Sequence, residues 1–139
     1  AAIRSNCITA QMGLQHVQES DKLTRINRGF RYESILRLMA NFNSRVAQNK
    51  LNAPDLISVT SEYQKGWDEF RALYTEYDDE LTVLIGMECR NEPTTFNDRL
   101  VKLREKRVKL NDGVVTFDGL FDKYQQGVDV LKQAQKVSG

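Results

Sequence analysis

The sequence contains one histidine, two cysteines and two prolines among 139 residues. A single histidine, His16, excludes zinc sites built from several histidines and the paired Glu-x-x-His motifs of di-iron helical bundles. The sequence also has no Cys-x-x-Cys pair, no Gly-x-x-x-x-Gly-Lys loop and no Gly-x-Ser-x-Gly turn. We therefore predict that the chain is not an enzyme and holds no cofactor and no metal ion.

An excess of charge of one sign is also lacking, because 20 Lys and Arg residues oppose 19 Asp and Glu residues. Such a balance gives no general attraction to nucleic acid or to an anionic membrane. No apolar stretch approaches the roughly 20 residues that a membrane-spanning helix needs. We expect no nucleic-acid partner and no membrane span. The first residues are not a signal peptide, although a leader cut after small residues would leave such a start.

Proline occurs only at positions 54 and 93, each time inside a polar break in the pattern. Proline is tolerated in the first turn of a helix, and the neighbouring Asn and Thr residues can act as caps. The breaks therefore predict three helices in a single domain, 1–139, with helices at about residues 6–49, 54–90 and 94–136. Short connections make consecutive helices antiparallel. The expected fold is all-α, an elongated antiparallel three-helix bundle with spectrin-like coiled-coil packing.

Apolar residues of the second and third segments recur at alternating steps of four and three residues, the periodicity of a coiled-coil seam. The second segment places Leu56, Val59, Tyr63, Trp67, Phe70, Tyr74, Tyr77, Leu81 and Leu84 on this seam. The third places Phe96, Leu100, Leu103, Arg107, Leu110, Val114, Phe117, Phe121, Tyr124, Val128 and Leu131 there. At this spacing we interpret the aromatic line around Trp67 as core, and expect no small-molecule ligand. The alternative is a groove for an aromatic or apolar ligand, as in helical sensor or carrier domains.

Two places interrupt this regularity. In the first segment the stripe of Leu23, Ile26 and Phe30 is displaced by about one residue from the stripe that follows it, and the slip falls beside Gly29. A bulge or kink there would keep both stripes facing inward, and the alternative is a separate short helix at the N-terminus.

In the third segment a turn or β-hairpin is conceivable at Gly113, but the continuous heptad phase favours one helix.

One charged residue, Arg107, falls on the seam of the third segment. An antiparallel hairpin brings it to about the level of Tyr77 and Asp78, so we predict that Arg107 and Asp78 fix the register of the two helices. The basic stretch around Arg107 then faces the acidic run at residues 76–80, which favours internal pairing over a phosphate-binding patch. Consecutive acidic residues of a helix point in different directions, so this run does not predict a cation site.

The two cysteines, Cys7 and Cys89, lie near helix ends that an antiparallel first hairpin brings together. A disulfide between them would close a loop of roughly 80 residues and contribute about 4 kcal/mol to stability on the chain-entropy estimate. Such a bond is typical of exported proteins. The alternative is a pair of free, buried thiols in a cytosolic coiled-coil adaptor.

Residues 81–87 are apolar on nearly every side of a helix. Leu81, Leu84 and Ile85 can face the neighbouring helices, which leaves Val83 and Met87 together on the other side, four residues apart. We predict that Val83 and Met87 contact a protein partner or a second copy of the chain. The alternative is that a bent N-terminal part of the first segment covers them.

The order and spacing of several residues along the sequence can be compared with those of other helical proteins. These positions are Cys7-Ile8, Tyr32, Arg37-Leu38, Leu73-Tyr74, Tyr77, Cys89, Pro93 and Phe96. In this layout the chain resembles the uncharacterised exported helical proteins of reduced-genome, host-attached bacteria. The resemblance implies an extracytoplasmic helical module, secreted or at the cell surface, and carries over no catalytic residue. The expected function is that of a non-enzymatic structural or protein-binding module.

Overall fold

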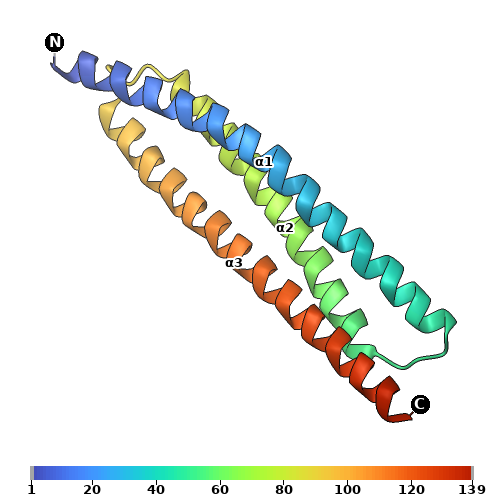
Figure 1. Cartoon of the computed structure of the whole chain (residues 1–139). Coiled ribbons are helices and arrows are strands. Elements are labelled where there is room, and N and C mark those ends of the chain that lie inside the picture. The colour runs from blue at the N-terminus through green and yellow to red at the C-terminus, as the bar shows by residue number, and fades with distance from the viewer. Residues whose placement is uncertain (1, 139) are drawn as a thin grey trace. The chain divides into compact units, whose positions relative to one another are not determined.

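The computed structural model describes residues 2–138, and its side chains are described for residues 6–136. Three helices make up nearly all of this part: α1 (Ala2–Gln48), α2 (Pro54–Ile85) and α3 (Pro93–Ser138) (Figure 1). Residues 2–138 contain no strand. The predicted all-α three-helix bundle is confirmed. The third helix runs without a break across Gly113, which excludes the β-hairpin there.

The connection from α1 to α2 is fixed by local backbone geometry. Lys50 has a φ of 58°, in the left-handed region. Its N–H donates to Ala47 O and the N–H of Leu51 donates to Val46 O, both at 3.0 Å. This pair of bonds is a Schellman motif, which satisfies carbonyls that have no partner at a helix C-terminus. Pro54 then occupies the first position of α2, where its missing N–H costs nothing.

The second helix ends at Ile85 and not near residue 90 as predicted. Gly86, which follows, has low helix propensity. Its N–H still donates to Thr82 O at 3.2 Å, but the next bonds are those of turns. Met87 and Cys89 therefore lie in the connection between α2 and α3.

The chain forms two compact units, and each contains a stretch of all three helices. Unit 1 comprises the described residues up to Arg28 together with Phe70–Asn111. Its core consists of Cys7, Tyr74, Tyr77, Leu81, Leu84, Cys89, Phe96, Leu103 and Leu110. Nearly all of these residues come from the predicted seams of α2 and α3. Among the α1 side chains that the structure describes, Cys7 is the one buried in this core, and Ala10 and Leu14 pack against it.

The expectation that both apolar stripes of the first segment face inward is wrong. Leu23 is 68% exposed, Ile26 is 54% exposed and Phe30 is 66% exposed. The helix is continuous through Gly29, so the alternative of a separate short N-terminal helix is not found in the described residues either. In unit 1, α1 turns Cys7 and Leu14 toward the core, and a regular helix that does so carries Leu23 and Ile26 on its outer side.

Unit 2 comprises Gly29–Glu69 and the described residues from Asp112 onward. Its buried side chains are Tyr32, Met39, Val46, Leu56, Val59, Tyr63, Trp67, Phe117 and Tyr124. Phe117 lies at the centre of an aromatic cluster, with ring centroids 4.9 Å from Tyr32, 5.1 Å from Tyr63 and 6.1 Å from Trp67. Such tilted and edge-to-face pairs add to the energy of burial. The side chain of Trp67 is therefore part of the core.

Two glycines of α3 in unit 2 should respond in opposite ways to alanine. A Cβ at Gly119 would meet nothing within 4 Å, whereas a Cβ at Gly127 would lie 2.7 Å from Cδ2 of the buried Leu56. Gly119→Ala should raise the free energy of unfolding by about 1 kcal/mol through helix propensity. Gly127→Ala should give no such gain, because Leu56 must move. Urea denaturation of both variants checks this, and an equal gain for both would contradict the packing at Gly127.

Candidate functional site

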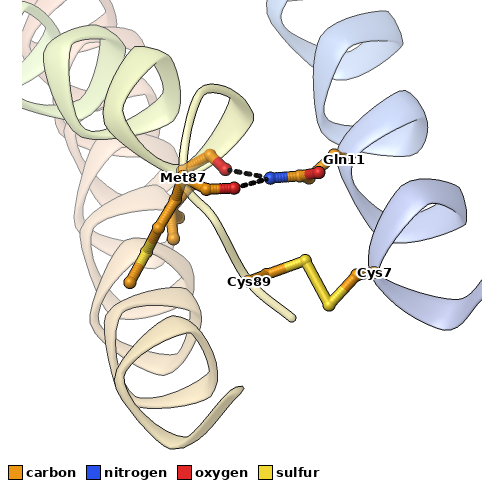
Figure 2. Close-up of a disulfide and its surroundings, with 5 residues drawn as sticks. Cys7, Gln11, Met87 and Cys89 are labelled. Atoms are coloured by element: carbon orange, nitrogen blue, oxygen red, sulfur yellow. Dashed lines mark hydrogen bonds between the residues drawn. A yellow bond between two sulfur atoms is a disulfide. The ribbon is translucent and has the colours of Figure 1, made fainter. Parts of the chain in front are cut away.

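A disulfide joins α1 to the α2–α3 connection in unit 1. Cys7 and Cys89 are paired with their Cα atoms 5.9 Å apart, and both side chains are buried. Figure 2 shows Cys7 on its helix and Cys89 in the turn that follows α2. The structure thus brings Cys7 and Cys89 to disulfide distance, as the predicted pairing requires. The loop that the bond closes spans a sequence separation of 82.

One turn after Cys7, Gln11 caps the C-terminal end of α2. Its Nε2 donates to Leu84 O at 3.1 Å and to Met87 O at 2.6 Å (Figure 2). Carbonyl groups at a helix C-terminus lack partners within their own helix, so a side-chain amide from another helix can satisfy them. Gln11 and the disulfide therefore hold the same end of α2 against α1.

A second glutamine continues this polar contact between α1 and α2. Gln18 Nε2 donates to Thr82 Oγ1 at 2.9 Å and to Asp78 Oδ1 at 3.3 Å. Asp78, predicted to pair with Arg107, thus accepts a hydrogen bond from α1. An ion pair between the acidic run and α3 is made by Glu80 with Arg99, at 3.6 Å.

Arg107 lies beside Tyr77, as predicted, but its acidic partner is Asp21 of α1. Its Nη1 donates to Tyr77 Oη at 2.7 Å and to Asp21 Oδ2 at 3.1 Å, and its Nη2 donates to Asp21 Oδ1 at 3.3 Å. Tyr77 Oη donates to Asp21 Oδ2 at 2.7 Å. Burial, followed by the hydrogen bond to Asp21, raises the pKa of Tyr77 above its ordinary value, so Tyr77 stays a neutral donor. The network joins all three helices of unit 1.

Sequence periodicity did not identify Gln11, Gln18 or Asp21. Their spacing could have identified them, because steps of seven and three residues place all three on the core-facing side of α1. A search for apolar periodicity passes over them because they are polar. Their partners on α2 and α3 make this face of α1 a hydrogen-bonded contact instead of an apolar one.

The Asp21–Arg107 contact should have a measurable effect on stability. Arg107→Met should lower the free energy of unfolding by about 1 kcal/mol, because Tyr77 and Asp21 lose a charged donor. The side chain of Arg107 is 46% exposed, so solvent screening keeps the effect small. The exposed Arg104 of the same helix is the matched control, and Arg104→Met should change stability by less than about 0.5 kcal/mol. Urea denaturation compares the two, and equal effects would contradict the network.

The predicted pair of Val83 and Met87 does not share a helix face. Val83 is 45% exposed on α2, but α2 ends before Met87, which packs against the core of unit 1 from the connection. The alternative, in which the start of α1 covers this segment with Ile8, Met12 and Leu14, holds in part: Leu14 packs against the core of unit 1, whereas Ile8 and Met12 are exposed. Val83 alone of the predicted pair is therefore on the surface.

Unit 1 instead presents a group of apolar side chains on one side of α1. These residues, here called the outer α1 face, are Ile8, Met12, Leu23 and Ile26. At about 100° per residue their directions from the helix axis fall within about 60° of one another. Glu19 lies on the same side, between the two apolar pairs. This surface is the strongest candidate in unit 1 for contact with another protein.

The single histidine and the acidic residues are the remaining candidates for chemistry in the sequence. His16 is exposed. No group of three His, Cys, Asp or Glu residues among those described is placed to hold a metal ion. The polar groups described above hold helices together.

Comparison with known proteins adds no further constraint. No protein-family model matches the chain, and no curated protein and no solved structure is significantly similar to it. Across the part of the chain that the structure describes, no helix combines the length and the apolar character that crossing a membrane requires.

Proposed function

We propose that the chain is a non-enzymatic, extracytoplasmic helical module that binds a protein partner, secreted or at the cell surface. The disulfide supports the compartment, because such bonds form and persist in oxidising environments and are rare in the cytosol. The layout of Cys7, Cys89 and the aromatic positions, which resembles that of exported helical proteins, supports the same compartment. The cytosolic adaptor is disfavoured, because it predicts free thiols.

The outer α1 face is the observation that carries the binding function. Single exposed apolar residues are normal on a protein surface, but a set aligned along one helix is typical of a recognition surface. Leu23 and Ile26 are three residues apart, and Ile8 and Met12 are four apart. Anchors at these spacings are those by which a helix is recognised in an apolar groove or by a second helix. The proposed partner is therefore a protein with an apolar groove or helix.

Photo-crosslinking in the cells that produce the protein tests this proposal. A benzoylphenylalanine at Ile26 should give crosslinked protein bands, because this position would lie inside the contact. The matched control is the same substitution at Val108, which is 59% exposed on α3 of unit 1 and outside the outer α1 face. A partner that is a second copy of the chain would be recognised by the mass of the adduct.

The substitution Leu23→Glu should then remove the Ile26 adduct while circular dichroism and thermal unfolding stay unchanged, since Leu23 is exposed. Bands that are identical at Ile26 and Val108, or an adduct that survives Leu23→Glu, would contradict a contact through this face. So would the absence of any adduct at Ile26.

A further inference from the structure

Unit 2 contains a surface groove between α1 and α3. The groove has a volume of about 540 Å³. Its lining residues are Ile35, Leu38, Met39, Phe42, Arg45, Phe121, Tyr124, Gln125, Val128, Asp129 and Lys132. This volume lies within the range of about 300 to 1,000 Å³ that is usual for sites of small organic ligands.

The floor of the α1–α3 groove is held in place by the core of unit 2. Met39 and Tyr124 are both buried. Tyr124 Oη donates to Met39 O at 3.1 Å and to Asn43 Oδ1 at 2.7 Å, which ties α3 to α1 beneath the groove. Leu38 is 65% exposed on the rim. The floor of the groove is therefore fixed by packed core residues, and its rim carries an exposed apolar side chain.

Charge is confined to one end of this groove. In unit 2, Tyr32 contacts Phe117, and further along both helices Phe42 contacts Tyr124, so α1 and α3 run in the same direction. The charged lining residues Arg45, Asp129 and Lys132 come last along each helix, and so they lie toward the same end. Two cations and one carboxylate give this end a net positive charge, while the other end is lined by apolar side chains such as Ile35 and Phe121.

We propose that the α1–α3 groove binds an amphiphilic anion of the fatty-acid class. The alkyl chain would lie along the apolar part, and the carboxylate would lie between Arg45 and Lys132. Arginine and carboxylate form charge-assisted, often bidentate, hydrogen bonds, which suits Arg45 to this role. Burial of each methylene in the apolar part adds to affinity. The site is separate from the outer α1 face, so the two proposals succeed or fail independently.

Isothermal titration calorimetry with straight-chain carboxylates, kept below micelle formation, tests the ligand class. Dodecanoate should bind saturably at one site per chain, and affinity should rise about fourfold with each methylene from octanoate to dodecanoate. Dodecyltrimethylammonium has an alkyl chain one carbon longer and the opposite charge, and it should still bind about tenfold more weakly. Equal binding of the two amphiphiles would overturn the role of the cationic end, and the absence of saturable dodecanoate binding would overturn the site itself.

Two substitutions and one control test whether the ligand binds in this groove. Leu38→Glu puts a carboxylate on the exposed rim, and Lys132→Glu reverses one of the two cations, so each should weaken dodecanoate binding at least tenfold. Lys136→Glu is the matched control, because Lys136 is exposed one turn further along α3 and does not line the groove. Circular dichroism should be unchanged in all three. Binding that survives both Leu38→Glu and Lys132→Glu, or that falls equally in Lys136→Glu, would contradict this location.

Discussion

Loss of the Cys7–Cys89 bond should lower the free energy of unfolding by about 4 kcal/mol. The bond connects residues with a sequence separation of 82. In the chain-entropy description, closing so long a loop removes many conformations from the unfolded chain and so favours the folded one. Small domains are usually stable by only about 5 to 15 kcal/mol, so the loss is a large share of the total. Guanidinium denaturation followed by circular dichroism measures it.

Four samples separate the effect of the bond from the effects of the side chains. The Cys7→Ser, Cys89→Ser and double variants should be nearly equal in stability, since each lacks the same bond. Wild-type protein in reductant should match them. If reduced wild type unfolds at the denaturant concentration of the oxidised protein, the bond does not restrain the unfolded chain in the proposed way. A single variant that is far less stable than the double variant would indicate an effect of one side chain.

Replacing Phe117 by alanine should cost about 3 to 5 kcal/mol, the usual range for removal of a buried aromatic ring. Phe117 is 2% exposed, and its ring contacts Tyr32, Tyr63 and Trp67. Gly66 faces the ring, and a Cβ at this position would lie 3.3 Å from Phe117 Cε1, closer than an ordinary van der Waals contact. The ring thus fills a closely fitted space, and its loss leaves a cavity that the surrounding side chains can fill only in part.

Tryptophan fluorescence is suited to this measurement. Trp67 is the single tryptophan of the chain and belongs to the same cluster, so its emission reports on unit 2. Val115, two residues away and 71% exposed, provides the control: Val115→Ala should change stability by less than about 0.5 kcal/mol. A cost below about 1 kcal/mol for Phe117→Ala would mean that the aromatic cluster is not a packed core.

The cores of α2 and α3 could be predicted from apolar periodicity because their buried residues are apolar. On α2 the predicted seam from Leu56 to Leu84 is buried at nearly every position. On α3 the fully buried residues are those seven apart, such as Leu103, Leu110 and Phe117, and the intervening seam positions are less buried. A heptad pattern thus identifies the inward face well. It does not distinguish full from partial burial within that face.

Periodicity failed on α1 because polar residues occupy its inward side in unit 1. Gln11 and Gln18 find acceptors on α2, and Asp21 finds donors on α2 and α3, so their burial costs little. Leu23 and Ile26, which an apolar pattern places inside, are left on the surface. The partner of Arg107 was missed for the same reason. Asp21 is far away in sequence, and only the placement of α1 brings it to Tyr77.

The end of α2, the Val83–Met87 surface and the α1–α3 groove depend on local backbone and side-chain geometry, which apolar periodicity does not encode. Val83 and Met87 share a face only if the helix continues, and the helix stops before Gly86. The α1–α3 groove depends on how the side chains of its lining residues pack between two helices of unit 2. Neither the helix end nor the space follows from the alternation of apolar residues.

The thiol state of the protein inside its own cells tests the account most directly. Cells are quenched in acid, free thiols are blocked with a maleimide reagent, and the mass of the protein is measured before and after reduction. We predict that neither Cys7 nor Cys89 is modified before reduction and that both are modified after it. Protein that carries two maleimides without prior reduction would show that the bond does not form where the protein works, and the proposal of an extracytoplasmic module would be wrong.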